Sequence, residues 1–327
     1  MPDPLDVVLI GPFNIDIIIN GKAPLEPEKL TNWFGLSRVS LNAAGSAGYV
    51  IMDLQRLGVR CGAISTIAWD ATGAFLLRAL QDAGVDTSHV RVQPDTTSAI
   101  GIYILLFGSK KRPLTGAVGT HMPWPESFNS TDLEYISKAR LLHFGGYLHY
   151  PKASGSHIVQ AYRLARSQGV ITSMDPQFPL EPVEPPWMPW LEGVIEFVDV
   201  FLCDEDEARH ITAVDDLDAA AQRLLDAGPR TLVIKRGHQG ALVFTADGQR
   251  IEQPPYVVPE DDIADTIGAG DAFDAGFLLG VLEGWPLART AQFASTVAAL
   301  SLRGPGGTET FPDRITAEVA RAAYFDR

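Results

Sequence analysis

The chain has 327 residues, of which 46% are hydrophobic and 20% are charged, as in ordinary globular proteins that bury a sizeable core. Its length lies within the range of a single large α/β unit. The 40 acidic and 26 basic residues give a net charge of −14, which argues against a nucleic acid or an anionic membrane as the main partner.

Apolar runs of strand length alternate with segments of helical periodicity along most of the chain. The expected strands lie at 5–10, 61–67, 141–144, 170–174, 198–202, 231–234 and 241–245. The expected helices lie at 47–57, 72–83, 155–167, 217–227, 272–282 and 287–302. This alternation is typical of βαβ units, and it predicts one three-layer αβα domain over residues 1–327 with a mostly parallel central sheet.

Four extended segments have no helix directly after them, and they break this rhythm. They lie at 14–20, 37–41, 99–107 and 114–118, within two insertions at about 13–42 and 97–120. Residues 108–112 would join the last two segments as a hairpin. We interpret these segments as a small separate sheet that forms a lid over the strand ends; an antiparallel extension of the main sheet is the alternative.

The two cysteines, Cys61 and Cys203, lie in apolar runs and show no metal-ligand spacing. They predict no disulfide framework, which fits a reducing, cytoplasmic compartment. Residues 1–11 enter a short strand with neither a basic region nor a long apolar segment, so we expect no signal peptide and no membrane span.

The most specific pattern is DTIGAGDAFDAGF, from Asp265 to Phe277. A Gly-Ala-Gly turn precedes Asp271 and an apolar run of helical length, so backbone N–H groups and the helix dipole would converge on an anion. A carboxylate belongs in a phosphate site where it must take a proton from a hydroxyl that attacks phosphorus. The alternative is an ordinary helix start whose acid is favoured by the dipole.

This motif resembles the C-terminal signature of the ribokinase/PfkB carbohydrate kinase family, which also contains adenosine kinases. The matching residues are Asp265, Thr266, Gly268, Ala269, Gly270, Asp271 and Phe273. Other family-like segments extend the resemblance over nearly the whole chain: 14–16, 44–48, 69–73, 84–88, 204–208 and 235–240. The resemblance implies a ribokinase-like fold with a lid sheet and an ATP-dependent kinase acting on the primary hydroxyl of a sugar.

The resemblance also implies roles for individual residues. Asp271 would be the general base, and the backbone N–H groups of Gly268, Ala269 and Gly270 would hold the transferred phosphoryl group. The implied substrate-binding residues are Asn14, Asp16, Gly45, Ser46 and Tyr49.

The implied ATP-binding residues are Asp204, Lys235, Gly237 and Gly240. Glu207 would orient water on Mg²⁺ carried in with ATP, since Mg²⁺ keeps much of its water shell. Asp265 and Ile267 would donate oxygens to a monovalent cation such as K⁺. Lid sheets in this family often pair, which implies a homodimer through the lid.

Three places depart from the family pattern. Tyr49 stands where the family has an Asn that touches the sugar, and Asp204 replaces the Asn before the metal-linked Glu. Residues 143–147 replace a segment that carries a substrate-binding Glu in ribokinase. These differences argue against ribose itself, while Asp271 and the anion turn are intact.

Other functions remain open. Tyr49 and the pair Gly145–Gly146, which would leave room for a base, favour a nucleoside kinase of the same family. A non-catalytic sugar-binding protein on the same fold is a further alternative. A dinucleotide-binding dehydrogenase is disfavoured because no G-x-G-x-x-G follows the first strand, and no Walker A sequence is present. Lys110, Lys111 and Arg112 would either reach a substrate phosphate or acidic sugar, or form a solvated hairpin end.

Overall fold

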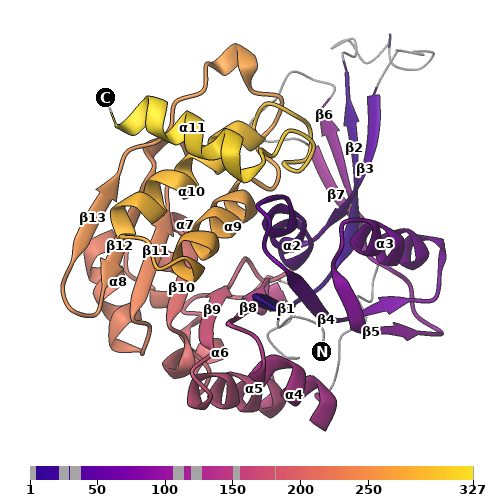
Figure 1. Cartoon of the computed structure of the whole chain (residues 1–327), viewed down its shortest axis with the longest axis horizontal. Coiled ribbons are helices and arrows are strands. Elements are labelled where there is room, and N and C mark those ends of the chain that lie inside the picture. Colours follow the sequence, from indigo (N-terminus) through magenta and orange to yellow (C-terminus); the bar gives the residue numbers. More distant parts are fainter. Residues whose placement is uncertain are drawn as a thin grey trace.

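The computed structural model describes residues 5–21, 29, 38–105, 127–149, 155–180 and 182–326, together with the backbone of 114–118. Nine strands make up the central sheet, in the order β13-β12-β11-β10-β9-β8-β1-β4-β5 (Figure 1). Their bounds are β1 (Val7–Ile10), β4 (Cys61–Ala68), β5 (Asp86–Gln93), β8 (Leu141–Gly145), β9 (Ile171–Asp175), β10 (Val200–Asp204), β11 (Thr231–Lys235), β12 (Ala241–Thr245) and β13 (Arg250–Gln253). From β5 to β11 all neighbours pair in parallel, and β12 and β13 add antiparallel strands at one edge. The mostly parallel sheet expected from the sequence is confirmed.

Helices cover both faces of this sheet. Their bounds are α2 (Ser46–Arg56), α3 (Ala71–Asp82), α4 (Ser130–Ser137), α5 (Ser156–Ser167), α6 (Met188–Leu191), α7 (Glu205–Thr212), α8 (Leu217–Asp226), α9 (Ala269–Leu282), α10 (Leu287–Ser301) and α11 (Arg314–Phe325). One hydrophobic cluster joins the sheet to α2, α3, α9 and α10, and a second joins it to α4, α5, α7 and α8. These two clusters confirm the three-layer αβα architecture.

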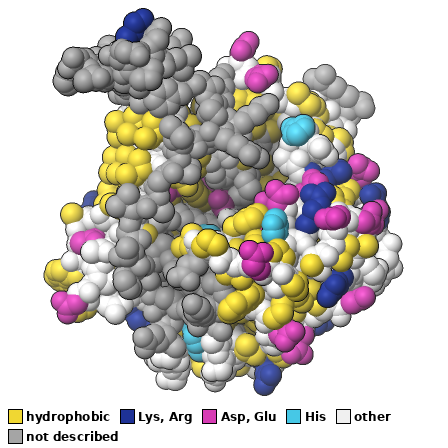
Figure 2. Space-filling view, turned by 180° about the vertical axis from the view of Figure 1, so that it is seen from behind, with side chains coloured by type: hydrophobic (Ala, Val, Ile, Leu, Met, Phe, Trp, Pro, Cys, Tyr) yellow, Lys and Arg dark blue, Asp and Glu magenta, His cyan; other side chains and the backbone are white. Residues whose placement is uncertain are grey.

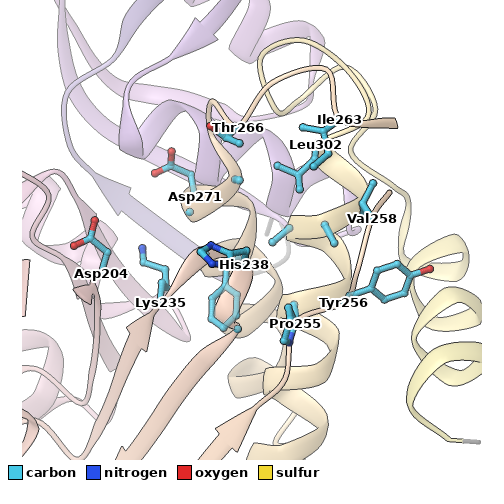
Figure 3. Close-up of a pocket in the computed structure, with 18 of the residues that line it drawn as sticks. Asp204, Lys235, His238, Pro255, Tyr256, Val258, Ile263, Thr266, Asp271 and Leu302 are labelled. Atoms are coloured by element: carbon cyan, nitrogen blue, oxygen red, sulfur yellow. The ribbon is translucent and has the colours of Figure 1, made fainter. Parts of the chain in front are cut away.

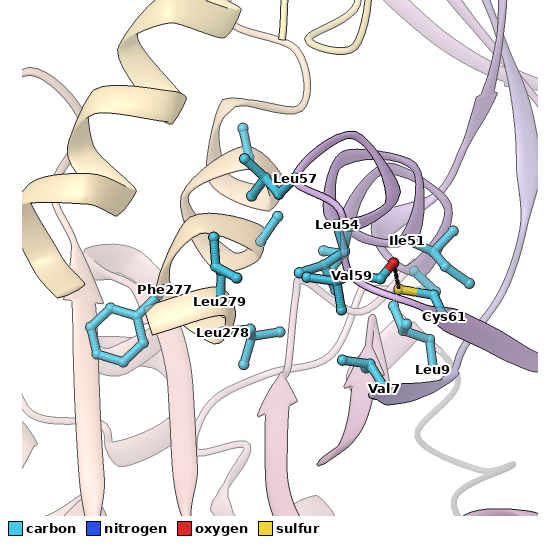
Figure 4. Packing of buried hydrophobic residues seen from close by; sticks show 14 of the residues in the cluster. Val7, Leu9, Ile51, Leu54, Leu57, Val59, Cys61, Phe277, Leu278 and Leu279 are labelled. Atoms are coloured by element: carbon cyan, nitrogen blue, oxygen red, sulfur yellow. Dashed lines mark hydrogen bonds between the residues drawn. The ribbon is translucent and has the colours of Figure 1, made fainter. Parts of the chain in front are cut away.

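Strand β1 shows why the central strands are continuous apolar runs. Val7 and Leu9 face the cluster beneath α2 and α9, whereas Val8 and Ile10 face the cluster on the other side. Figure 4 shows Leu54 of α2 and Leu278 of α9 directed into the first cluster. Because both faces of the strand are buried, its sequence does not alternate with polar residues.

A second, separate sheet of four strands has the order β3-β2-β6-β7. Its strands are β2 (Asn14–Asn20), β3 (Arg38–Ala44), β6 (Ile100–Leu105) and β7 (Leu114–Val118). The extended segments therefore form their own sheet and not an extension of the main one. The expected hairpin tip with Lys110, Lys111 and Arg112 lies outside the described residues.

One expectation about this sheet was wrong, because a helix does follow one of its strands directly. Strand β3 continues to Ala44, and α2 begins at Ser46 with only Gly45 between them. Gly45 has φ +85°, and a Cβ atom there would lie 2.6 Å from the carbonyl oxygen of Pro12. Only glycine fits this junction without strain, so the strand can turn into the helix within one residue.

Six elements were not expected from the sequence: β5, β13, α4, α6, α7 and α11. The strand β5 reads DTSHVRVQ and lies at the sheet edge, where its residues are half-buried or exposed. The helix α4 is short, and a capping box between Asn129 and Asp132 marks its start. The strands β5 and β13 contain no continuous buried run, which explains why a search for such runs did not find them.

The surface and the cysteines agree with a globular chain. On the face shown in Figure 2, acidic and basic side chains are intermixed over the part of the surface that is described. Cys61 and Cys203 are buried and free. Among the described residues, the helices are all too short or too polar to cross a bilayer.

Candidate active site

The predicted anion turn forms the start of α9. Gly268 precedes the helix with a left-handed φ of +72°, and its carbonyl oxygen accepts the Ala272 N–H at 2.8 Å. The first N–H groups of a helix have no intrahelical acceptor, so those of this turn point out of its end. The Ala269 N–H makes a long bond of 3.4 Å to Thr266 O. The turn thus brings peptide nitrogens and the positive end of the α9 dipole to one place.

Asp271 lies in the first turn of α9 and is only 8% exposed. Burial raises its pKa to about 7, the negative charge of Asp175 adds to the rise, and the ammonium of Lys235 opposes it. A carboxylate with a pKa near neutrality is half ionised at physiological pH, which suits a group that must accept a proton. Asp271 therefore has the electrostatic setting of a general base.

A buried ion cluster lies next to Asp271. The Lys235 ammonium, at the end of β11, is 3.0 Å from Asp175 Oδ2 and 3.0 Å from both carboxylate oxygens of Asp274. Asp175 ends β9, and Asp274 follows Asp271 by three residues on α9. Oxygens of Asp175, Asp271 and Asp274 lie within 4.8 Å of one another. Three carboxylates and one ammonium thus share a space that is almost closed to water.

Two carboxyl groups of this cluster have pKa values shifted in opposite directions. Burial raises the pKa of Asp175, but the Lys235 ammonium outweighs it, and the pKa lies below its ordinary value. Burial raises the pKa of Asp274 far above its ordinary value, although Lys235 opposes this, and the charge of Asp175 raises it further. Lys235 thus holds the pKa of Asp175 down, whereas burial holds that of Asp274 up.

Gln177 also reaches this cluster. Its side-chain amide is 3.0 Å from Asp175 Oδ2 and 3.5 Å from Asp271 Oδ1. Its φ of +56° is uncommon for a residue with a side chain. Such strain often marks a functional position, since the surroundings must hold the residue in place.

Sequence reasoning missed Asp175, Asp274 and Gln177. Two signals were available: Asp175 is a charged residue that ends an apolar strand, and Asp274 follows Asp271 at helical spacing. Lys235 was expected to contact the nucleotide. Its ammonium pairs with two carboxylates and the residue also lines the adjacent cavity, so its contact with the nucleotide stays a prediction.

That cavity has a volume of about 630 Å³, within the range of small-molecule sites. Figure 3 shows Asp204, Lys235 and Asp271 at one end, and Val258, Ile263 and Leu302 at the other. The predicted residues that line it are Asp204, Glu207, Lys235, Gly237, Gly240, Ala269, Gly270 and Asp271. The fold therefore joins the expected ATP-binding residues, the metal-linked Glu and the anion turn at one cavity.

Asp204 and Glu207 form a capping box at the start of α7. Asp204 Oδ1 accepts the Glu207 N–H at 2.7 Å, and Glu207 Oε2 accepts the Asp204 N–H at 2.7 Å. Burial raises the pKa of both groups, most strongly that of Glu207, where the charge of Asp175 adds to it. The box engages one oxygen of each carboxylate. Asp204, a departure from the family pattern, is therefore the helix cap.

Asp16 lies on strand β2 of the second sheet, and its charge contributes to the raised pKa of Asp271. Its Oδ1 accepts the Asn14 amide at 2.7 Å, and its Oδ2 accepts the Tyr49 hydroxyl at 2.6 Å. Burial raises the pKa of Asp16 to about 6, and both hydrogen bonds oppose the rise. Two of the expected sugar-binding residues, Asn14 and Tyr49, thus donate hydrogen bonds to another one, Asp16.

Tyr49 links the lid to the anion turn. A Cβ atom on Gly268 would lie 3.4 Å from the Tyr49 ring, so the ring packs directly against the turn. The tyrosine at this departure from the family pattern therefore contacts both Asp16 and the start of α9.

Two further glycines lie in close contact with neighbouring side chains, one of them with Ser46. A Cβ atom on Gly145 would lie 2.8 Å from Ser46 Oγ, and one on Gly146 would lie 2.7 Å from His149 Nδ1. Both glycines are therefore needed for close packing. The room that they were expected to leave for a base is taken by neighbouring residues.

Asp265 is buried and ties two loops together. Its Oδ1 accepts the Ile267 N–H at 2.9 Å, and its Oδ2 accepts the Gly306 N–H at 3.0 Å. These bonds hold the residues before the anion turn against the loop after α10. The monovalent cation expected at Asp265 and Ile267 stays a prediction.

Comparison with known proteins gives this site a context. The model of the pfkB family carbohydrate kinases matches residues 5–314. An ATP-dependent 6-phosphofructokinase of Thermoanaerobacterium thermosaccharolyticum is 25% identical over 94% of this chain and 91% of its own. A 5-dehydro-2-deoxygluconokinase of Geobacillus kaustophilus is also 25% identical, with the same coverage.

A solved structure, Arabidopsis thaliana ribokinase complexed with ribose and ATP, has the same fold. It superposes with a TM-score of 0.77 over 97% of this chain and 98% of its own, at 19% identity. The family match spans nearly the whole chain and includes the anion turn and Asp271. The chain therefore belongs to the pfkB family of carbohydrate kinases, which makes it a phosphotransferase with an alcohol group as acceptor.

Proposed function

We propose that this protein transfers the γ-phosphoryl group of ATP to the primary hydroxyl of a sugar. One observation carries the proposal: Asp271, with a pKa raised to about 7, lies where the cavity of about 630 Å³ meets the turn Gly268–Gly270. ATP as donor is supported by the ATP-dependent phosphofructokinase and by the ribokinase bound to ATP, both relatives of this chain.

In the proposed reaction, Asp271 accepts the proton of the sugar hydroxyl as that oxygen bonds to the γ-phosphorus. The bond from phosphorus to the β–γ bridging oxygen breaks, and ADP leaves. The N–H groups of Gly268, Ala269 and Gly270 stabilise the charge on the phosphoryl oxygens. Their place at the end of α9 adds the field of the helix dipole.

Asp204 and Glu207 fit a role next to Mg²⁺. Both are oxygen donors on the cavity wall, and their capping box uses only one oxygen of each carboxylate. Carboxylate oxygens and water are the ligands that Mg²⁺ prefers, and its charge would neutralise the nucleotide phosphates. We infer that these two residues hold the hydrated ion.

Asp16 is the proposed sugar anchor. The Asn14 amide and the Tyr49 hydroxyl each occupy one of its oxygens, and each oxygen keeps a further lone pair for a sugar hydroxyl. Close packing around Gly145 and Gly146 removes the main support for a nucleoside substrate. A sugar or sugar acid, the kind of substrate named for the two relatives, is the substrate class we favour.

We also infer a homodimer through the lid. β3 is an edge strand of the lid sheet, and on it Val39 and Leu41 are 55% and 51% exposed. Exposed apolar side chains on an unpaired edge favour pairing with a second copy.

The proposal is tested with a coupled assay of ADP release across hexoses, pentoses, keto-acid sugars and nucleosides, with and without Mg²⁺. For the best substrate, Asp271→Asn should lower kcat by about 10²–10⁴-fold and leave ATP binding intact. Asp226→Asn, at the exposed end of α8, is the matched control and should retain full turnover.

Undiminished turnover in Asp271→Asn would refute the assignment of the base. ADP release with nucleosides and none with sugars would instead identify a nucleoside kinase. Sugar binding without any ADP release would indicate a non-catalytic sugar-binding protein.

A further inference from the structure

The acid cluster beside Asp271 has the donor set of a divalent-metal site. Its three carboxylates come from two elements, β9 and α9, and offer oxygens within 4.8 Å of one another. Oxygen-only clusters of this kind suit hard cations such as Mg²⁺ and Mn²⁺. An ion among the three would coordinate Asp271 together with Asp175 and Asp274.

In the structure, the positive charge next to these carboxylates is the ammonium of Lys235. Its ammonium donates to Asp175 and to Asp274 at 3.0 Å, and an ammonium has three donors and no acceptor. The Lys235 side chain is 11% exposed, while Asp175 and Asp274 are 0% exposed, so water does little to screen the three charges. A divalent ion would have to displace the ammonium to reach the cluster.

Lys235 also lies close to the anion turn. A Cβ atom on Gly270 would be 3.7 Å from the Lys235 ammonium. A single positive charge therefore lies against Asp175, Asp274 and the Gly270 backbone at once. Among the described residues, no other lysine or arginine forms an ion pair with Asp175 or Asp274.

We propose that Lys235 is a positioning residue, the resident cation of this cluster, which fixes Asp175 and Asp274 and keeps divalent metals away from Asp271. The catalytic part of this inference rests on the proposed function, because a divalent cation bound to the Asp271 carboxylate would favour its ionised form and make it a poorer proton acceptor. In the proposed reaction Mg²⁺ must stay with the nucleotide, near Asp204 and Glu207. Without Lys235, the three aspartates would compete for it.

The test measures metal binding without nucleotide or sugar. Purified wild type and Lys235→Gln are titrated with Mn²⁺, and bound ions are counted by electron paramagnetic resonance and by calorimetry. Glutamine removes the charge but keeps a hydrogen-bond donor for the aspartates. We expect Lys235→Gln to bind one more Mn²⁺ per chain than wild type.

Two matched variants locate the extra ion. Lys235→Arg keeps the positive charge and should bind no more Mn²⁺ than wild type. The double variant Lys235→Gln/Asp274→Asn removes one carboxylate and should lose the extra ion. Circular dichroism confirms that each variant is folded. If Lys235→Gln is too unstable to titrate, Lys235→Met is heated with and without Mn²⁺, and the proposal predicts that Mn²⁺ raises its melting temperature more than that of wild type.

A second measurement separates positioning from a general structural role. At fixed Mg·ATP, excess free Mn²⁺ should lower kcat of Lys235→Gln at least tenfold while the KM for ATP changes little, and wild type should be unaffected.

A folded Lys235→Gln without an extra Mn²⁺ would overturn the proposal, and so would a gain of Mn²⁺ that persists in the double variant. Because ion counting needs no turnover, it stays informative if Asp271→Asn refutes the proposed base. In that case the extra ion would still support Lys235 as the resident cation, and only its link to catalysis would fall.

Discussion

Two buried carboxylates whose charges act on Asp271 are held by different kinds of partner. Asp16, on the lid, is held by two neutral donors, the Tyr49 hydroxyl and the Asn14 amide. Asp175, at the end of β9, is held by the ammonium of Lys235. Burial raises the pKa of Asp16 to about 6, whereas the charge of Lys235 takes that of Asp175 below its ordinary value.

The contrast shows what each carboxylate is suited for. Neutral donors orient a carboxylate but do not repay its lost hydration, so its charge depends on pH and on incoming ligands. A buried ammonium fixes the charge and binds the group to its partner. Asp16 is thus suited to meet a ligand, and Asp175 is suited to hold the site together.

The largest expected effect compares the removal of the two carboxylates. Asp175→Ala leaves a buried ammonium short of one partner, and we expect a loss of about 3 kcal/mol in the free energy of unfolding. Asp16→Ala removes an acceptor from two neutral groups and should cost about 1–2 kcal/mol. Urea unfolding of both variants at pH 7 measures the difference. Equal losses would mean that the ion pair adds nothing beyond hydrogen bonding.

A smaller effect concerns Asp271, whose pKa is raised by the charges of both groups. The pKa of Asp271 in the folded state is about 7, above the ordinary value of 3.8. Between pH 4 and pH 7 the folded state therefore binds the proton more tightly than the unfolded state, and the wild type loses stability as the pH rises through this range. Asn at this position does not titrate. Between pH 5 and pH 8, Asp271→Asn should therefore gain about 2–3 kcal/mol relative to wild type. Thermal melts at both pH values test this, and a constant difference would show that Asp271 has no raised pKa.

The smallest effect concerns the neutral donors of Asp16. Tyr49→Phe removes a hydrogen bond that lowers the pKa of Asp16, so this pKa should rise above its value of about 6. A hydrogen bond worth about 1 kcal/mol corresponds to a rise of up to about one pKa unit. More Asp16 is then protonated at pH 7, and kcat/KM for the sugar should fall several-fold and recover at pH 8.5. Tyr162→Phe, which loses a buried hydrogen bond to Ser173 O within the second hydrophobic cluster, is the control. An unchanged pH profile would separate Tyr49 from the charge of Asp16.

Local pattern was enough to predict the frame of the molecule and one part of its site. The apolar runs of β1, β4 and β8 to β12 were visible because each strand is buried on both faces. The turn before Asp271 was visible because a left-handed residue followed by a tight helix start requires glycine at Gly268. Both features depend on residues that are close together in the chain, so they can be recognised from the sequence alone.

Elements at the edge of the sheet and contacts between side chains far apart in the sequence could not be predicted in this way. Strand β5 is half exposed and polar, so no apolar period marks it. Tyr49 donates to Asp16 across 33 positions of sequence, and Lys235 meets Asp175 and Asp274 across 60 and 39 positions. A charge has no preferred partner until the fold removes water and brings particular groups within a few ångströms. Sequence therefore revealed which residues are capable of this chemistry, and only the packing of β9, β11 and α9 decided which of them act together.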